Sequence, residues 1–380
     1  MAMQPVNDPA APMLLFEHSV AGGRILAEAR FNSEPTLNSL SLEMIEILAP
    51  ALDRWEDDSR VAAVLITGAG DRAFSAGGDI QALYRAIVKN HQAGAVVDDY
   101  PYRFFEHEYR LDYRLHTYPK TIVCVGHGII MGGGLGVFSG SRYRVVTEKS
   151  RIALPEVTIG LFPDAGGTWL LRNLPEQVAV FIGLTGSSLN GADALALGLG
   201  THSVSLAEHE IVRDRLLGMD WSGDADADDA RVRAVLDALP AADMPEAQVA
   251  QLPDSLSASG TPAEVAQRIA GLEGQGKWID GGIAAMGRGC PTTIGIVIEQ
   301  LRRARTMSLA EAFQLEMIVA THCANHPDFA EGVRALLIDK DNKPNWRYKK
   351  LEELPEAYVA EHFEAPWPQN PLHDLEETTA

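Results

Sequence analysis

The stretch from Gly126 to Trp169, GHGIIMGGGLGVFSGSRYRVVTEKSRIALPEVTIGLFPDAGGTW, decides how the rest of the chain is interpreted. An apolar run, Lys120 to Val125, precedes it and predicts a strand, and the triple glycine from Gly132 to Gly134 then opens a helix-like segment, Leu135 to Ser139. Glycine lets a ligand approach main-chain N–H groups closely, and N–H groups at the start of a helix favour negative charge. This arrangement is typical of a site that binds an oxyanion.

A second glycine pair lies upstream, at Gly77 and Gly78. It follows a strand candidate, Val61 to Thr67, and precedes a helical pattern from Ile80 to Lys89. Two N–H donors usually share one oxyanion, and losing one of them costs on the order of 100-fold in rate or more. The alternative interpretation is that each glycine cluster only makes a tight turn between a strand and a helix.

Two acids stand beside glycine turns in the same region. Glu156 follows a strand-like run, and Asp164 lies eight residues further on, just before Gly166 and Gly167. A carboxyl group that is partly removed from water has a raised pKa, which suits proton transfer near neutral pH. From spacing alone, Asp164 could equally cap a helix that begins near Gly166, and Glu156 could be an ordinary loop acid.

Two motifs carry a resemblance to a known family. AFSAGGDI at Ala73 to Ile80 and GHGIIMGGGLG at Gly126 to Gly136 resemble the crotonase (enoyl-CoA hydratase/isomerase) superfamily. Leu154 to Leu171 and His326 to Trp346 resemble one branch of it, the 3-hydroxyisobutyryl-CoA hydrolases. The resemblance runs from about Leu14 to Trp346 and implies an α/β fold, a spiral of repeated strand-strand-helix units with a C-terminal helical layer.

The resemblance also implies roles for particular residues. The main-chain amides of Gly78 and Gly133 match those that hold the thioester oxygen, and Glu156 and Asp164 match acids that contact the substrate and serve in catalysis. Glu108 matches a glutamate that contacts the acyl group, whereas spacing alone would place it on a solvated helix face. Enoyl-CoA hydratases carry a second catalytic glutamate three residues after the oxyanion glycine, where this chain has Gly136. This difference favours the hydrolase branch.

The resemblance therefore predicts an acyl-CoA thioester hydrolase that converts 3-hydroxyisobutyryl-CoA to 3-hydroxyisobutyrate and CoA, in valine catabolism. The alternatives are an enoyl-CoA hydratase or isomerase that uses Glu156 alone, and a catalytically silent acyl-CoA binding module. Coenzyme A is part of the substrate, so no cofactor is expected, and a homo-oligomer is compatible with the family. His322 and His326 lack a second pair of metal ligands, so we expect a structural helix and no metal.

The composition limits the partners. A formal net charge of −20 disfavours nucleic acid and anionic membranes, which need a positive protein face. No apolar run reaches the roughly 20 residues that span a bilayer, and the N-terminal residues lack a basic targeting pattern, so we expect a cytoplasmic protein. Coenzyme A is polyanionic and needs local basic groups, for which the candidates are Arg85, Lys89, Arg103 and Lys120.

The pattern of elements predicts how the chain is divided. Met13 to Ser19 and Arg24 to Ala29 read as a hairpin, and Ser41 reads as the N-cap of the following helix. We expect a spiral core with the active site over residues 13–204, a helical region packed on it over 205–370, and flexible ends at 1–12 and 371–380. Within the second region the acidic segment Gly223 to Asp229 predicts a solvated linker. Further helices are expected at 231–239, 263–272, 292–305, 309–324 and 328–340.

Overall fold

The structure is a computed structural model that describes residues 4–375; the outermost parts of the two expected flexible ends, 1–3 and 376–380, lie outside the described residues. The chain forms two compact units, each built from three separate segments. The first unit contains residues 1–78, 114–152 and 189–247, and the second contains residues 79–113, 153–188 and 248–380. The division at residue 204 stays a prediction.

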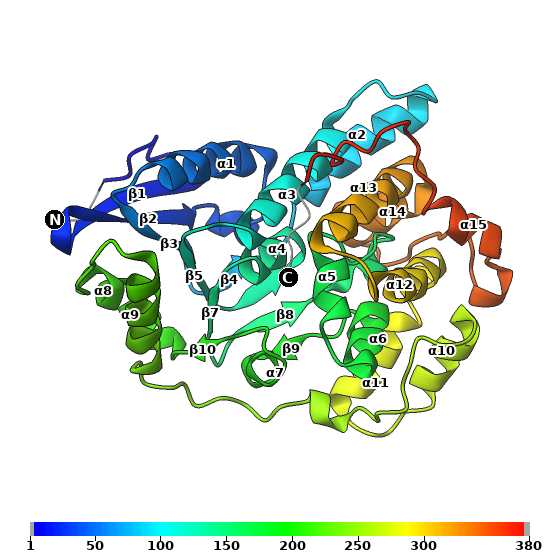
Figure 1. Cartoon of the computed structure of the whole chain (residues 1–380). Coiled ribbons are helices and arrows are strands. Elements are labelled where there is room, and N and C mark those ends of the chain that lie inside the picture. Colours follow the sequence, from blue (N-terminus) through cyan, green and yellow to red (C-terminus); the bar gives the residue numbers. More distant parts are fainter. Residues whose placement is uncertain (1–3, 376–380) are drawn as a thin grey trace. The chain divides into compact units, whose positions relative to one another are not determined.

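A six-stranded sheet forms the first unit's frame (Figure 1). Its order is β1-β2-β3-β5-β7-β10, where β1 and β2 are antiparallel and the later neighbours are parallel. The β1-β2 pair confirms the predicted hairpin. The strand bounds are β1 Met13–Val20, β2 Arg24–Phe31, β3 Val61–Gly68, β5 Thr121–Gly126, β7 Tyr143–Val146 and β10 His202–Ser203.

Alternating residues of this sheet build the core of the first unit. Leu65, Val123 and Val145 are fully buried and pack with apolar residues of helices α8 (Ile211–Leu217) and α9 (Ala225–Asp237). Helix α1 (Leu42–Asp57) lies against β1 and β2. Its N-cap is Ser41, whose side chain accepts a hydrogen bond from the Met44 N–H at 3.2 Å, as the sequence predicts.

The expectation of a solvated linker at residues 223–229 is wrong. Asp224 is the N-cap of α9, where its side chain accepts the Ala227 N–H at 2.9 Å. Asp228 is buried and accepts hydrogen bonds from the Ser222 and Gly223 N–H groups. Acids near the start of a helix are favoured by its dipole, so the acidic run begins a helix.

A four-stranded sheet of order β4-β6-β8-β9 carries the glycine motifs. Its strands are β4 Ala73–Ser75, β6 Ile129–Met131, β8 Arg151–Ala153 and β9 Leu189–Asn190. Strands β4 and β6 are parallel neighbours. Helix α4 (Gly132–Ser139) starts directly at the end of β6, and α7 (Gly191–Ala196) follows β9.

The second unit is mainly helical. Helices α12 and α13 form much of its interior, since both are buried over most of their length and contact α5. The predicted helices near 263–272, 292–305 and 309–324 are confirmed to within two residues. The helices are α2 Ile80–Ala93, α3 Tyr100–His116 up to its last turn, α5 Gly167–Arg172, α6 Glu176–Thr185, α10 Pro262–Ala270, α11 Lys277–Met286, α12 Pro291–Ala304, α13 Leu309–Asn325, α14 Pro327–Val333 and α15 Glu356–Glu361.

Short helical turns complete the two units. The segment predicted as one helix over 328–340 divides into α14 and a π-helical turn, Arg334–Ile338, in which Leu336 is exposed. The 3₁₀ turns are Ala21–Gly23, Glu34–Thr36 and Leu206–Glu208 in the first unit, and Pro155–Thr158, Val249–Gln251 and Leu351–Glu353 in the second. Among residues 4–375, no helix has both the length and the apolar character needed to cross a bilayer.

The start of the expected mobile tail packs onto the second unit: Leu372 is buried, and Asp374 pairs with Arg110 on α3 at 2.9 Å.

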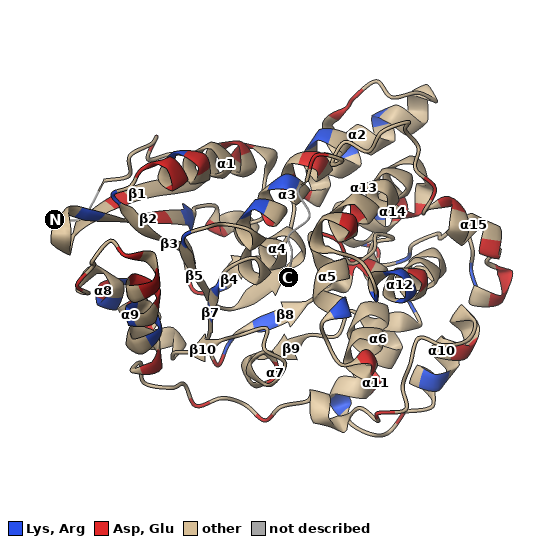
Figure 2. Ribbon diagram, in the orientation of Figure 1, with Lys and Arg blue, Asp and Glu red and all other residues tan. Residues whose placement is uncertain are grey.

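Charges of both signs are interspersed along the helices despite the net charge of −20, for example on α1 and α9 (Figure 2). An anionic ligand therefore depends on local basic groups. Lys89 pairs with Asp98, and Lys120 donates to the Trp55 and Asp58 carbonyls.

Candidate active site

Five buried carboxyl groups lie in the interior of the second unit, and we call them the carboxylate cluster. Helix α3 supplies two of them, four residues apart, and α13 supplies a third. The 3₁₀ turn Pro155–Thr158 and the loop before α5 supply the other two. The members are Glu108, Asp112, Glu156, Asp164 and Glu316, each at most 6% exposed. Three residues predicted from the sequence, Glu108, Glu156 and Asp164, are thus brought into one buried set.

The local backbone explains why Glu156 and Asp164 are buried. Pro155 occupies the first position of a 3₁₀ turn, where its fixed φ suits the helical start, and the turn carries Glu156 inward. After Asp164 the chain reverses through Ala165 at φ 52° and Gly166 at φ 82°. The N-cap residue of α5 is Gly166, which has no side chain to accept a helix N–H. The alternative interpretation of Asp164 as a helix cap is therefore wrong.

Two side chains from distant parts of the sequence hold this left-handed turn. Glu316 on α13 accepts the N–H groups of Gly166 at 2.9 Å and Thr168 at 2.8 Å. Gln300 on α12 donates to the Pro163 carbonyl at 2.7 Å and to the Thr168 hydroxyl at 2.7 Å. The sequence analysis missed both residues. The available signal was a charged residue between Leu315 and Met317 in an otherwise apolar helical run.

Tyr109 fixes the position of Asp164 from the other side. Its hydroxyl donates to Asp164 Oδ2 at 2.8 Å, and the ring is fully buried beside Phe105 and Phe313. The tyrosine hydroxyl and the fixed turn together hold the Asp164 carboxyl in one orientation. A group that reacts with or positions a substrate atom needs such a fixed orientation. The sequence analysis also missed Tyr109.

Burial shifts the acidities of the whole cluster. It raises the pKa of Asp164 to about 7, against the hydrogen bond from Tyr109, which lowers it. Burial raises the pKa of Glu316 to about 8, although its two backbone N–H bonds act in the opposite direction. Burial, followed by repulsion from Asp164, holds the pKa values of Glu108 and Glu156 well above their usual range. At neutral pH the cluster therefore keeps protons that it can transfer.

Some cluster oxygens have no hydrogen-bond partner within the described part of the chain. They are Glu108 Oε1, Glu156 Oε2 and both carboxyl oxygens of Asp112. A buried polar atom without a partner costs about 1–3 kcal/mol, so native proteins keep few of them unless a ligand or water uses them. Oxygens of this kind can accept hydrogen bonds from a bound polar group or from water. Glu106, by contrast, pairs with Arg110 at 3.2 Å on the helix face, as expected for a solvated acid.

The two glycine turns lie together in the first unit. Strands β4 and β6 run parallel, so the turns that follow them leave from the same edge. A Cβ added to Gly77 would lie 3.3 Å from the Met131 carbonyl oxygen, and one added to Gly134 would lie 2.5 Å from Ser75 Cβ. Such close backbone approach requires glycine, and Gly77 also has a φ of 103°.

The same geometry determines where the main-chain N–H groups of Gly78 and Gly133 lie. Gly133 is the second residue of α4, where a backbone N–H has no acceptor within the helix. In the turn that contains Gly78, Leu40 donates its N–H to the carbonyl of Gly77 at 2.7 Å. Both amides therefore belong to turns at the carboxyl ends of neighbouring parallel strands, where α/β proteins commonly bind ligands. Their role as an oxyanion hole stays a prediction.

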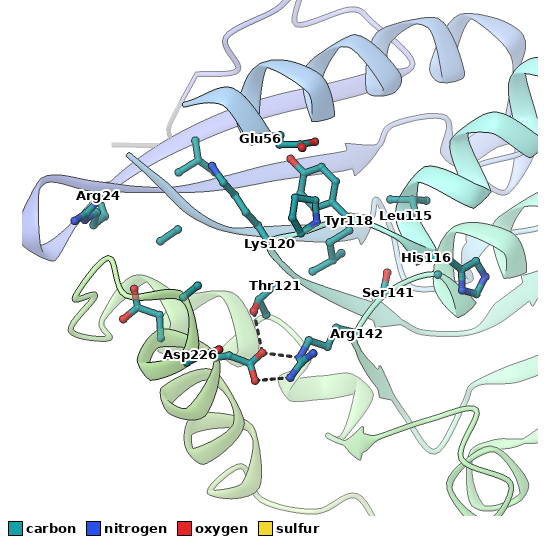
Figure 3. A pocket seen from close by; sticks show the side chains of 18 of the residues that line it. Arg24, Glu56, Leu115, His116, Tyr118, Lys120, Thr121, Ser141, Arg142 and Asp226 are labelled. Atoms are coloured by element: carbon teal, nitrogen blue, oxygen red, sulfur yellow. Dashed lines mark hydrogen bonds and ion pairs between the residues drawn. The ribbon is translucent and has the colours of Figure 1, made fainter. Parts of the chain in front are cut away.

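A large cavity of about 660 Å³ lies elsewhere, at the amino ends of β3, β5 and β7 in the first unit (Figure 3). Two of its arginines are already paired: Arg142 forms an ion pair with Asp229 at 2.6 Å, and Arg144 donates to the Leu199 and Gly198 carbonyls. It contains none of the predicted catalytic residues. The amino ends of parallel strands are also the less usual place for a ligand. We therefore do not assign the active site there.

Comparison with known proteins places this geometry in context. A family model described as "Enoyl-CoA hydratase/isomerase" matches residues 26–363. The chain is 34% identical over 368 residues to the mitochondrial 3-hydroxyisobutyryl-CoA hydrolase of Danio rerio, covering 94% of this chain and 91% of the relative. It is 34% identical over 344 residues to 3-hydroxyisobutyryl-CoA hydrolase 1 of Arabidopsis thaliana, covering 88% and 87%.

Solved structures agree on the fold. A carnitinyl-CoA dehydratase from Mycobacterium thermoresistibile is 30% identical with a TM-score of 0.82, covering 96% of this chain and 99% of that one. An enoyl-CoA hydratase from Rhodobacter sphaeroides is 31% identical with a TM-score of 0.78, covering 93% and 98%. The crotonase-like α/β fold expected from the sequence is confirmed.

Proposed function

Since this chain belongs to the enoyl-CoA hydratase/isomerase family, we propose that it is an acyl-CoA thioester hydrolase that converts 3-hydroxyisobutyryl-CoA to 3-hydroxyisobutyrate and CoA. The relatives with this activity in their names match along most of the chain. The observation that carries the proposal is the buried carboxylate cluster, which contains Glu108, Glu156 and Asp164. Gly136 has no side chain to serve as the second carboxylate of a hydratase.

In the proposed reaction the amides of Gly78 and Gly133 polarise the thioester carbonyl. Glu156 removes a proton from water, which attacks the carbonyl carbon, and the C–S bond breaks when the tetrahedral intermediate collapses. The thiolate of CoA leaves and takes up a proton. In the second route Glu156 attacks the carbonyl itself, and water then cleaves the mixed anhydride.

Asp164 and Glu108 serve the acyl group. We assign Asp164 to orient the 3-hydroxyl group or to move a proton, because Tyr109 and the turn at Gly166 hold its carboxyl in one place. Glu108 has an unpaired buried oxygen that can accept a hydrogen bond from a substrate hydroxyl. A hydroxyacyl group supplies the donor that such a site needs, whereas a plain acyl group leaves the oxygen unpaired.

The test compares two activities of one preparation. Release of free CoA thiol from 3-hydroxyisobutyryl-CoA is measured beside hydration of crotonyl-CoA. Rapid thiol release without hydration supports the hydrolase. Hydration without thiol release contradicts it and favours the alternative, a hydratase or isomerase that uses Glu156 alone. That alternative is included because the two similar solved structures are a dehydratase and a hydratase.

The finer parts of the proposal concern context. We propose that the enzyme works in valine catabolism, uses no cofactor beyond the CoA of its substrate and is cytoplasmic, and a homo-oligomer is compatible with its family. The Danio rerio relative is named as mitochondrial, which differs from the proposed location. Cell fractionation tests which location holds for this chain. Sedimentation of the purified chain tests the assembly. Activity retained after dialysis against a chelator supports catalysis without a metal, and lost activity contradicts it.

A further inference from the structure

Three groups that can coordinate a metal meet at one corner of the second unit, and none of them belongs to the carboxylate cluster. His322 lies on α13, and His326 lies between α13 and α14. Glu361 ends α15, and His362 follows it. One ligand atom each from His322, His326 and Glu361 lies within 4.8 Å of the other two. The sequence gives only the two histidines four residues apart; the fold adds the third ligand.

The local backbone explains the meeting of the two histidines. Pro327 follows His326 and disfavours helical geometry at the residue before it, so His326 is extended at φ −90° and ψ 158°. Its N–H still donates to the His322 carbonyl at 2.9 Å. The two rings therefore stack with centroids 6.0 Å apart. The corner between α13 and α14 thus presents two imidazoles on one side.

Helix α15 brings the acid to these rings. Glu361 Oε1 lies 3.5 Å from His326 Nε2. Two ligands of a tetrahedral Zn²⁺ at about 2.0–2.2 Å are separated by about 3.4 Å, so this pair already has the required spacing. The Glu361 side chain is half exposed and can turn, which allows it to adjust to an ion.

His322 makes the outer hydrogen bond that is typical of a metal-binding imidazole, and its neighbour His362 makes a similar one. His322 Nε2 bonds the Glu364 carbonyl at 2.8 Å, and His362 Nδ1 bonds the Tyr358 carbonyl at 2.8 Å. Each ring donates one N–H to a carbonyl, which directs the lone pair of its other nitrogen elsewhere. Metal-ligating histidines almost always make such a bond. The buried His362 ring also packs 4.6 Å from His326, between centroids, and supports it.

We propose that His322, His326 and Glu361 form a binding site for a divalent transition-metal ion of the Zn²⁺ type, which joins α15 to the corner between α13 and α14. Two imidazoles and one carboxylate are a ligand set that Zn²⁺ uses, with water as the fourth ligand. Imidazole nitrogen disfavours Mg²⁺ and Ca²⁺, which prefer oxygen ligands. The site is structural and independent of the proposed thioester hydrolysis.

The experiment uses the full chain without a histidine tag, after dialysis against a chelator. Titration with Co²⁺ is followed by its visible absorption, and Zn²⁺ is measured by calorimetry and by competition with Co²⁺. The expected result is one equivalent bound, an absorption of tetrahedral Co²⁺ that Zn²⁺ removes, and a higher melting temperature with metal. His326→Ala and Glu361→Gln should weaken binding by at least about tenfold.

His373→Ala is the matched control, because His373 is exposed and bonds the Asn370 carbonyl outside this group. It should bind the metal as the unsubstituted chain does. Glu361→Gln changes an exposed group, so it keeps the test valid if His326→Ala does not fold. Failure to bind one equivalent overturns the proposal, and so does unchanged binding in both site variants. Thioester hydrolysis is measured in parallel and should not change in Glu361→Gln.

Discussion

Glu316 is the residue whose substitution tests the description of the carboxylate cluster most directly. Its carboxyl accepts two backbone N–H groups, from Gly166 and Thr168, and is fully buried. Glu316→Gln keeps the shape of the side chain but replaces one acceptor oxygen with an NH₂ group. One backbone N–H then faces a donor, and an unpaired buried donor costs about 1–3 kcal/mol. We expect this loss in the free energy of unfolding at pH 5.

The difference between the two proteins should depend on pH. Burial raises the pKa of Glu316 to about 8 in the folded state, whereas its value in the unfolded chain is near 4.5. Between these values the folded protein holds a proton that the unfolded chain has released. The stability from this group is therefore fully present below about pH 4.5 and is lost as the pH rises towards 8, by at most about 1.4 kcal/mol per pH unit. Glutamine does not titrate, so the deficit of Glu316→Gln should shrink from pH 5 to pH 8, and it should reverse in sign where that loss exceeds the cost of about 1–3 kcal/mol.

The assay is urea unfolding at pH 5 and pH 8, followed by fluorescence and circular dichroism. Glu311→Gln, on the same helix, is the control, because Glu311 reaches only the exposed Ser308 N–H at the helix start. It should change stability by less than about 0.5 kcal/mol at either pH. A deficit for Glu316→Gln that is absent at pH 5, or the same at both pH values, would refute the assigned hydrogen bonds or the raised pKa.

Three further predictions concern catalysis and packing. Glu156→Gln should lower kcat for thiol release by about 100-fold or more while CoA-ester binding stays measurable, and full activity in that variant would remove Glu156 from the mechanism. The kcat/KM for thiol release should rise with pH, because Glu156 must lose its proton to act as the base and burial raises its pKa well above the usual range; a flat profile from pH 5 to 8 would contradict this. Gly134→Ala should destabilise the fold by about 1–3 kcal/mol in thermal melts, since its Cβ would lie 2.5 Å from that of Ser75. Gly281→Ala on α11 is the control. Its Cβ meets nothing within 4 Å, so the change should be neutral or stabilising.

Sequence patterns between close neighbours correctly predicted the elements that depend on close neighbours. The hairpin of β1 and β2 and the cap at Ser41 follow from neighbours in sequence, and the structure has both. The same reasoning failed at residues 223–229, because a run of aspartates suggested solvent. The capping preference of Asp224 and the helix dipole were the stronger effects there.

The candidate site was predicted in part, for a physical reason. Glycine turns and acids beside them stand close together in sequence and indicated Gly133, Glu156 and Asp164 as candidates, and the resemblance to the crotonase superfamily favoured them over a turn, a cap or a loop acid. The groups that fix them come from far away: Glu316 is 150 residues from Gly166, and Tyr109 is 55 residues from Asp164. Their contacts arise from helix packing, which local periodicity does not encode. His326 and Glu361 illustrate the same point, since only the fold makes them neighbours.

The interleaved composition of the two units affects how the chain is made. Strand β3 ends at Gly68, but its neighbour β5 begins at Thr121, 53 residues later. At about 5–20 residues per second, the ribosome needs about 3–10 s to supply that partner. During this interval one edge of the apolar strand β3 has no partner strand. Unpaired strand edges form hydrogen bonds readily with other chains. We therefore expect newly made chains to need chaperone protection at this stage of synthesis, before Glu156, Asp164 and Glu316 have been added.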